Sequence, residues 1–289
     1  MRRGPLYMVI ASLGFVAMVA FVKQARGQLS TFEVMLWRGL LAAPLVYLIA
    51  RGQGGLRIHR RGLFLGRMVL GTAAMFGAYF GAAALPVADH ALIWRSQPLF
   101  VAALAPLFLG HGERPGGRVW GLLLVGLVGC GVLLGPKVQL GAQALVPGMV
   151  VLAGAGFAGA AHVAVRALNR SETPAALVFW FQIAIITAAG LGAVSTTGLH
   201  WPPADAWPWL AGASLASVVG QLFMTHAYRH DRAAVVSAAG YMAPVWAVLV
   251  DLIFFGQAPG GWALLGGGLI VASSALLLVG GPRATPATP

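Results

Sequence analysis

The chain has 289 residues, of which 59% are hydrophobic and only 9% are charged. Soluble domains carry about 25% charged residues, so this composition excludes an ordinary water-soluble protein and favours one embedded in a lipid bilayer. The formal net charge of +12 would suggest nucleic acid as the partner of a soluble protein. Here we expect no nucleic acid, and we read the charge as a sign of membrane topology and of contact with anionic lipid headgroups.

Ten apolar stretches follow one another along the chain, joined by short linkers. Each has about the 20 residues that an α-helix needs to cross a bilayer. The sequence therefore predicts an all-α integral membrane protein without a separate soluble domain, ending in a disordered cytoplasmic tail at 282–289. The ten predicted transmembrane helices are residues 5–23, 30–50, 63–86, 90–109, 118–136, 145–167, 175–197, 207–229, 233–255 and 259–280.

Arginine and lysine residues concentrate in alternate linkers. The positive-inside rule places the richer linkers in the cytoplasm, which predicts that both termini are cytoplasmic. Only Lys23, Arg26 and Lys137 then lie outside. The cytoplasmic residues are Arg2, Arg3, Arg51, Arg57, Arg60, Arg61, Arg67, Arg114, Arg118, Arg166, Arg170, Arg229, Arg232 and Arg283.

The two halves of the chain repeat each other, as predicted domains 1–140 and 141–281. Because each half has five spans, an odd number, the second half enters the membrane from the opposite side. Such inverted repeats place a substrate site near the midplane, between the halves. The repeat also argues that the first apolar run is a retained helix and not a signal peptide. The collinear matches are Pro5 and Gly14-Phe15 with Pro147 and Gly156-Phe157, Pro98 with Pro244, and Pro115-Gly116-Gly117 with Pro259-Gly260-Gly261.

Several segments carry a family resemblance. In the first half they are Lys23, Arg38, Ala78 to Ala88, Pro98-Leu99-Phe100 and Gly112-Glu113-Arg114. In the second half they are Gln221, Ala227-Tyr228-Arg229, Pro244-Val245-Trp246 and Gly256-Gln257-Ala258-Pro259. Together they resemble the EamA type of the drug/metabolite transporter superfamily. The resemblance implies a ten-helix transporter of the bacterial inner membrane that moves amino acids, nucleotide-related metabolites, cations or drugs, often outward. One departure is Gln257, where the first half has Glu113.

Arg95 is the candidate binding residue with the strongest physical argument. A charge within a membrane helix costs about 2.5–3.5 kcal/mol on insertion scales, and Arg95 lies three residues before Pro98, which interrupts helical hydrogen bonding. A guanidinium at such a kink suits a carboxylate or phosphate of a substrate. The alternatives are an ion pair with Glu33 or a position among the outer headgroups. Trp94 and Gln97 flank Arg95 and are expected to line the same site.

The equivalent position in the second half is Tyr241, three residues before Pro244. Ser237, Tyr241, Pro244 and Asp251 fall on one helical face, and such a polar stripe is expected to face the bundle interior. Asp251 and Glu33 are the candidate proton carriers. A solvated position near the membrane interface is the alternative for Asp251.

The remaining candidates lie on other spans and are expected to surround the same midplane cavity. Arg38 is expected either to brace the bundle or to line this cavity, and Pro98 and Pro244 to act in gating. No cofactor and no metal site is expected. The single cysteine, Cys130, lies in an apolar helix, which excludes disulfides and cysteine-based metal sites within the monomer. His226 and His230 could share a helix face, but the neighbouring Arg229 and Arg232 would repel a cation. The further substrate-binding candidates are Tyr79, His162, Trp180, Gln221, Thr225 and Trp246.

Taken together, the sequence predicts an alternating-access transporter, not an enzyme, whose partner is a small molecule. The expected cargo is an amino acid or a similar small metabolite, moved outward. The alternative is uptake of a nucleoside-like or S-adenosylmethionine-like metabolite around the same residues. An intramembrane enzyme would need a nucleophile with its base, or a cluster of metal ligands, at one depth. The coupling ion and the oligomeric state stay open.

Overall fold

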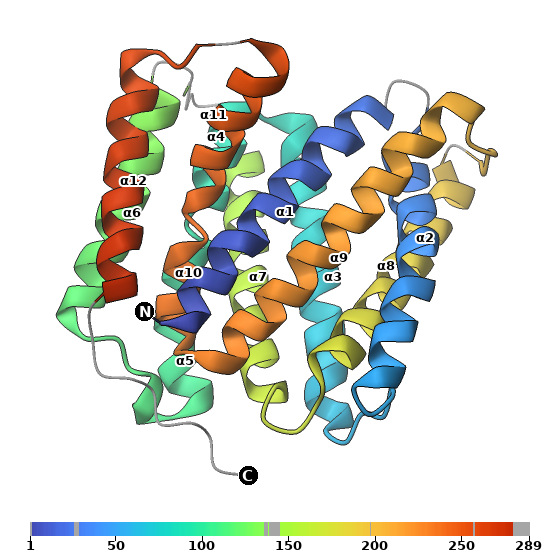
Figure 1. The fold of residues 1–289 in the computed structure, drawn as a ribbon, viewed down its shortest axis with the longest axis horizontal. Coiled ribbons are helices and arrows are strands. Elements are labelled where there is room, and N and C mark those ends of the chain that lie inside the picture. The colour runs from blue at the N-terminus through green and yellow to red at the C-terminus, as the bar shows by residue number, and fades with distance from the viewer. Residues whose placement is uncertain are drawn as a thin grey trace.

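A computed structural model describes residues 2–25, 29–135, 138, 145–196, 198–256 and 258–279. Within these ranges the secondary structure is helical, and ten bundle-crossing units form an all-helical membrane protein (Figure 1). By length and composition, nine of the described units are apolar enough to span a membrane. The remaining unit is the third, which carries Arg61 and Arg67 in its first two turns.

The helices begin and end within about three residues of the predicted spans. The first half consists of α1 (Arg3–Ala25), α2 (Thr31–Gly52), α3 (Arg61–Ala84), α4 (Val87–Trp94), α5 (Gln97–Leu109) and α6 (Gly117–Leu134). The second half consists of α7 (Leu145–Leu168), α8 (Pro174–Thr196), α9 (Trp207–His230), α10 (Ala233–Ala239), α11 (Met242–Phe255) and α12 (Gly261–Val279).

The fourth and ninth spans, which the sequence predicts as single helices, are each broken in two. Pro98 is the second residue of α5 and Pro244 the third of α11, and proline is favoured in the first turn of a helix because its missing N–H is not needed there. Before each proline the chain makes tight i→i+3 turns, from Ser96 to the Ile93 carbonyl and from Tyr241 to the Ala238 carbonyl. Each proline therefore begins a second half-helix, and Arg95 and Tyr241 lie in the breaks.

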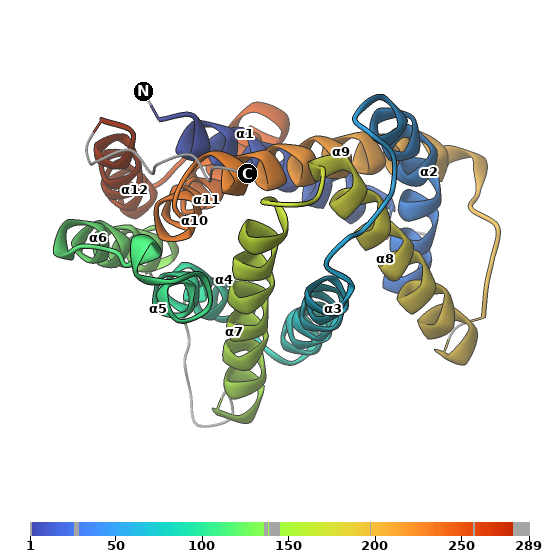
Figure 2. The ribbon, with the colours of Figure 1, turned by 90° about the horizontal axis from the view of Figure 1, so that it is seen from below.

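The helix packing follows a two-fold pattern. Interchanging the two halves maps the pair α1–α9 onto α7–α3, and the pairs α2–α8 and α6–α12 onto themselves; all four are the most extensive helix contacts among the described residues. Figure 2 shows α6 and α12 at one end of the bundle and α2 and α8 at the other. The structure therefore has the symmetry that the inverted repeat predicts.

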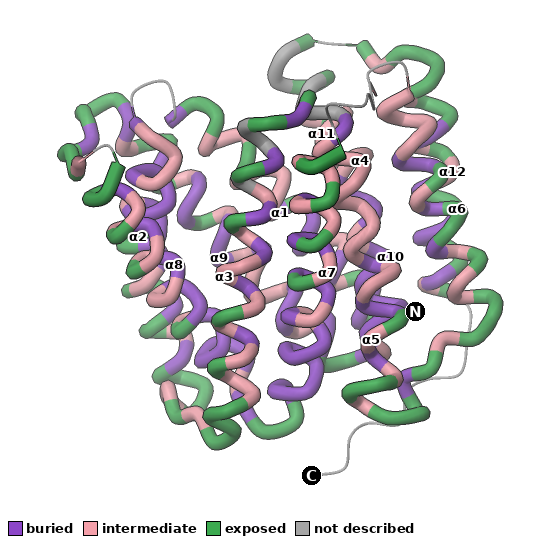
Figure 3. The backbone as a smooth tube through the Cα atoms, turned by 180° about the vertical axis from the view of Figure 1, so that it is seen from behind, coloured by how far each residue is buried: buried purple, intermediate pink, exposed green. Residues whose placement is uncertain are grey.

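Glycines allow the close approach within the pairs α1–α9 and α3–α7. A Cβ atom at Gly14 would lie 2.9 Å from the backbone nitrogen of Gly220, and one at Gly77 would lie 2.9 Å from the Cα of Gly154. Small residues at helix crossings bring backbones together in membranes, where dispersion contacts replace the hydrophobic effect. Figure 3 places most buried residues on the central helices and the exposed ones on outer surfaces such as those of α6 and α12.

The two ends of the bundle differ in charge. We call the end where α1 begins, together with the linkers 53–60, 110–116, 169–173 and 231–232, the basic face, because most arginines lie there. It is the lower end of the molecule in Figure 1. The linker 198–203 and the start of α2 lie at the opposite face.

Candidate functional site

The two helix breaks bring a cation and a phenol into the middle of the bundle. Arg95, at the end of α4, is partly exposed, and Tyr241 is 1% exposed. The two side chains lie close enough for the arginine charge to act on the phenol. Neither the Arg95 Nε nor the Tyr241 hydroxyl has a hydrogen-bond partner among the described residues. The two breaks therefore each present a donor with unused hydrogen-bonding capacity.

A second polar group, which we call the His162 cluster, consists of Gln97, His162 and Tyr228 from α5, α7 and α9. The Gln97 Nε2 lies 2.5 Å and the Tyr228 hydroxyl 3.1 Å from the Nδ1 of His162. Because an amide nitrogen only donates, Nδ1 accepts, and the neutral imidazole carries its proton on Nε2. His162 is partly exposed while Tyr228 is fully buried, so the cluster can offer the imidazole to a ligand.

A further charged residue, Arg67, lies close enough to the His162 cluster for its charge to act on His162. Arg67 was not singled out as a site residue from the sequence. It was assigned to the cytoplasmic charges, but the structure places it nearly two turns into α3, 5% exposed, with its guanidinium 4.2 Å from the centroid of the Phe181 ring of α8. Its charge acts on His162, and its Nη1 has no hydrogen-bond partner among the described residues. The sequence did contain a signal for this position. A membrane helix that begins at Arg61 places residue 67 nearly two turns inside the membrane.

The predicted tryptophans do not gather around one cavity. Trp94 lies against α7, with a ring atom 3.3 Å from where a Cβ of Gly154 would be, and its ring stacks with His90. The Trp246 indole donates to the Val9 carbonyl, at 3.2 Å, and so ties α11 to α1. Trp180 donates to a carbonyl of the 53–60 linker and is partly exposed near the basic face. Of the three, Trp94 is nearest to the helix break.

Two of the predicted binding candidates, Gln221 and Thr225, lie one turn apart on α9, and the Thr225 hydroxyl forms a hydrogen bond within its own helix. The Thr225 hydroxyl donates to the Gln221 carbonyl at 2.7 Å, and the Thr225 carbonyl accepts from the Asn169 side chain at 2.9 Å. The side chains of Tyr79 and Asp251, two further candidates, lie outside the described residues. The roles predicted for Gln221, Thr225, Tyr79 and Asp251 in binding or coupling stay predictions.

Arg38 and Glu33 take part in contacts that hold helices together. The Arg38 guanidinium donates to Ser217 at 2.8 Å, and Ser214 donates to the Arg38 carbonyl at 2.9 Å, which connects α2 to α9. Glu33 caps α2 by accepting from the Ser30 N–H and also accepts from the backbone N–H of His200 at 2.9 Å. Arg38 thus contacts α9 through both its side chain and its carbonyl, its role in bracing or in lining the cavity stays a prediction, and Glu33 lies at the opposite face, away from Arg95.

The bundle is fastened at the basic face by a buried ion pair. The Arg166 Nε donates to Glu113 at 2.9 Å, and an Nη of Arg166 donates to the Tyr228 carbonyl at 2.9 Å. The second carboxylate oxygen of Glu113 accepts from the N–H of Ala233 at 2.8 Å. This contact joins the ends of α5, α7, α9 and α10. The half-helices α5 and α10 also pack together, whereas α4 and α11 form no comparable contact among the described residues.

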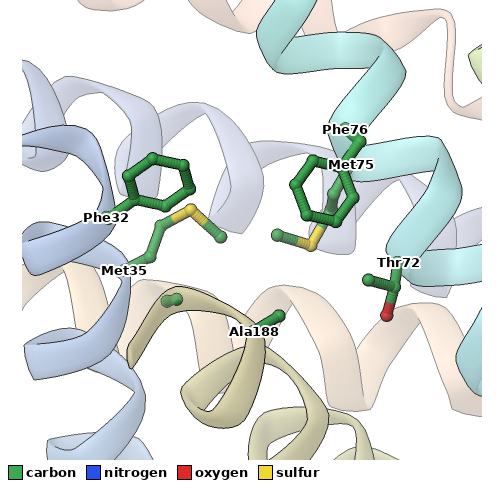
Figure 4. Close-up of a pocket in the computed structure, with 7 residues that line it drawn as sticks. Phe32, Met35, Thr72, Met75, Phe76 and Ala188 are labelled. Atoms are coloured by element: carbon green, nitrogen blue, oxygen red, sulfur yellow. The ribbon is translucent and has the colours of Figure 1, made fainter. Parts of the chain in front are cut away.

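A small pocket opens between α2, α3 and α8 (Figure 4). Met35 and Met75 point into it from α2 and α3, and only Thr72 among its lining residues has a polar side-chain atom. Such a lining cannot recognise a charged group, so the polar groups of the helix breaks and of the His162 cluster form the stronger candidate site. The lining residues are Phe32, Met35, Thr72, Met75, Phe76, Ala188 and Ala189.

Each face of the bundle also carries one glutamate–histidine contact. At the opposite face His200 Nδ1 lies 2.8 Å from Glu33, and at the basic face His59 Nδ1 lies 3.1 Å from Glu172. In both contacts the same carboxylate also accepts the backbone N–H of that histidine. The two contacts join equivalent linkers, since interchanging the halves carries one onto the other.

The contact at the basic face predicts a pH dependence of stability. Burial alone would raise the pKa of Glu172, but hydrogen bonds from the backbone and side chain of His59, from the Arg60 N–H and from Ser171 outweigh it and lower this pKa below its ordinary value of 4.5. The unfolded chain therefore binds more protons near this value. The stabilisation is full above about pH 4.5 and is lost as the pH falls through the lower folded value.

We expect the unfolding temperature of the wild type in detergent to fall more steeply below about pH 4.5 than that of Glu172→Gln. The variant should also be less stable at neutral pH, by about 1–3 kcal/mol, because buried donors lose a charged acceptor. Thermal melts from pH 3.5 to 7.5 measure both effects. If the unfolding temperatures of the two proteins changed with pH in parallel, the lowered pKa of Glu172 would not be the cause of the pH dependence.

The described residues contain no group of three or more histidine, cysteine, aspartate or glutamate side chains placed to hold a metal ion. What the polar arrangement can do is bind. It offers two guanidinium groups, two phenols, an amide and an imidazole within an inverted-repeat bundle, where transporters of this architecture hold their substrates.

Known proteins match along nearly the whole chain. The family model of the EamA-like transporter family matches twice, at residues 2–135 and 146–279. The pseudopaline exporter CntI of Pseudomonas aeruginosa is 30% identical over 94% of this chain and 94% of its own length. A riboflavin transporter of Rhizobium johnstonii is 27% identical over 95% of this chain and 90% of its own.

A solved crystal structure confirms the fold. It has a TM-score of 0.82 at 18% identity and covers 96% of this chain and 97% of its own. The ten-helix architecture predicted from the sequence is therefore correct, and transport, not enzymatic catalysis, is the activity of the family. The double match over both halves shows that the chain belongs to the EamA-like transporter family, within the drug/metabolite transporter superfamily, and is a multi-pass membrane transporter.

Proposed function

We propose that this transporter exports an amino acid or a similar small carboxylate-bearing metabolite across the bacterial inner membrane. The observation that carries the proposal is the guanidinium of Arg95, whose Nε is buried without a hydrogen-bond partner among the described residues, in a helix break beside the unsatisfied hydroxyl of Tyr241. A carboxylate is the group that such donors bind most strongly, since charge-assisted hydrogen bonds are roughly twice as strong as neutral ones. Trp94 would pack against the apolar part of the cargo.

The direction of transport is proposed from the similarity to a pseudopaline exporter. The ion pair of Glu113 with Arg166 and the packing of α5 on α10 close the basic face, and the positive-inside rule assigns that face to the cytoplasm. An exporter releases its cargo from a conformation closed toward the cytoplasm, and an importer binds its cargo in the same conformation. The closure is therefore compatible with export but does not select it.

Flux measurements in proteoliposomes test the proposal. Vesicles loaded with labelled amino acids, pseudopaline, riboflavin or nucleosides are diluted into unlabelled buffer, with and without an imposed pH gradient. We expect selective efflux of amino acids or of pseudopaline. Efflux that does not respond to the gradient would identify a facilitator, whereas absence of flux for every carboxylate in the panel would refute the proposed cargo.

A flat aromatic metabolite is the second candidate cargo. The rings of Trp94 and His90 lie nearly parallel, with 15° between the planes, which supports a site that could take a further flat ring, and the relative from Rhizobium johnstonii is named a riboflavin transporter. Riboflavin or nucleoside flux without amino-acid flux in the same panel would select this candidate. The transport direction would then be set by loading the compound on either side.

A further inference from the structure

Arg67 is a buried cation that forms no salt bridge with any of the described residues. Its side chain is 5% exposed, one face of the guanidinium is covered by Phe181, and Nη1 has no hydrogen-bond partner among the described residues. An uncompensated charge in this environment is strongly unfavourable. The face of the guanidinium is stacked, but its edge, which carries the N–H donors, is the part that binds carboxylates in a bidentate manner.

No described carboxylate forms a salt bridge with Arg67. None of its seven acidic residues lies on α3, α5, α7, α8 or α9, the helices that hold Arg67 and its neighbours. The acids in the adjoining linkers are already engaged: Glu113 binds Arg166, Glu172 binds His59, and Asp231 binds Arg2. A bound ligand is therefore the available source of a countercharge.

Arg67 and Arg95 are connected by the His162 cluster. Arg67 lies close enough to His162 for its charge to act on the imidazole. His162 in turn contacts Gln97, two residues after Arg95 along the chain. The polar groups thus run from the helix break toward the basic face, with a guanidinium at each end and an amide, an imidazole and a phenol between them.

We propose that Arg67 and Arg95 are two anchor points for one substrate that carries two separated carboxylates, with the His162 cluster contacting the polar groups between them. This inference rests on the proposed function and adds a substrate class to it: dicarboxylic amino acids and related dianions are preferred over monocarboxylates of the same length. Gly71 makes the second anchor possible, because a Cβ at this position would overlap the Arg67 guanidinium.

A matched pair of substrates tests the inference in the wild-type protein. In 2-aminoadipate and norleucine the chains have the same number of carbon atoms, and a terminal carboxylate in the first replaces a methyl group in the second. We expect the wild type to transport 2-aminoadipate with a KM lower than that for norleucine by about tenfold or more, because one additional charge-assisted contact contributes this much. Equal KM values for the two would overturn the inference without recourse to any variant.

Two variants assign the preference to Arg67. Arg67→Gln removes the charge, and Gly71→Ala keeps the charge but displaces the guanidinium. Both are expected to reduce the KM ratio of norleucine to 2-aminoadipate toward one. Arg170→Gln, an exposed arginine of the basic face, is the matched control and should keep the wild-type ratio. A ratio unchanged in Gly71→Ala and Arg67→Gln, each monodisperse in detergent, would overturn the assignment.

The failure of the inference can be told from the failure of the proposed function. If both amino acids are transported and both depend on Arg95, but the wild type does not discriminate between them, the proposed function stands and the second anchor is wrong. If neither amino acid is transported, the proposed cargo is wrong as well. Inhibition of wild-type flux by a series of α,ω-dicarboxylates then decides the second anchor alone: inhibition that peaks at one chain length supports it, and no inhibition contradicts it.

Discussion

Replacement of Arg95 by alanine is expected to lower transport of a carboxylate substrate by about 100-fold while leaving the protein inserted and folded. The guanidinium provides charge-assisted hydrogen bonds worth about 1.5–3 kcal/mol, in a bundle interior where water replaces them poorly. Its removal also relieves the cost of a poorly compensated charge, so stability should not fall. Initial efflux rates from proteoliposomes, together with melting curves of the same preparations, measure the two effects separately.

Arg95→Lys is the informative companion variant. Lysine keeps the positive charge but lacks the planar fork that holds both oxygens of a carboxylate, so an intermediate loss of transport is expected. Arg170→Ala serves as the exposed control with wild-type flux. Full transport in Arg95→Ala would show that the cargo is held elsewhere, and loss of both transport and thermal stability would assign Arg95 to the structure of the bundle.

Glu113→Gln is expected to cause the largest loss of stability, about 3–5 kcal/mol. The Glu113–Arg166 pair is buried on both sides, with side chains 6% and 9% exposed. Loss of one partner leaves an uncompensated charge in a region of low dielectric constant. The glutamine oxygen still accepts one hydrogen bond, but as a neutral acceptor, and either the Arg166 Nε or the N–H of Ala233 then loses its acceptor altogether.

A double-mutant cycle checks this prediction. If Arg166→Met is destabilising alone but Glu113→Gln adds little to it, the two substitutions share one interaction, and the magnitude of their coupling free energy approaches the loss of about 3–5 kcal/mol expected for Glu113→Gln alone. Urea or thermal unfolding in detergent provides the free energies. Additive effects of the two substitutions would show that the pair contributes nothing as a pair.

The sequence predicted the fold well because membrane helices can be identified from long apolar stretches in the sequence. Length and hydropathy located all ten spans, and Pro98 and Pro244 indicated where two of them bend. The prolines do not reveal that the bend is a full break, since that depends on the turns that Ser96 and Tyr241 make with preceding carbonyls. The break had to be seen in the structure.

The site was predicted only in part, because pairing between distant residues leaves no local pattern. Arg95, Gln97, His162 and Tyr241 were singled out as polar residues within apolar helices, and the structure brings Gln97 and His162 into contact. By contrast, Arg67 was hidden among the interfacial arginines by its closeness to Arg61. The same limitation applied to Trp246, whose indole donates to α1, more than 230 positions earlier in the chain.

If transport proceeds by the alternating access that the sequence predicts, the matched contacts of Glu33 with His200 and of Glu172 with His59 constrain how the two faces of the bundle can open in turn. Both contacts exist in one and the same conformation, so they do not behave as alternating locks. They fix the two ends of the α2–α8 pair at once. The α2–α8 pair is therefore held rigid at both ends. A rearrangement that opens one face of the bundle either moves α2 and α8 together as a rigid body or breaks one of the two glutamate–histidine contacts. The other helices, and above all the half-helices on either side of the two breaks, are where the bending must be concentrated.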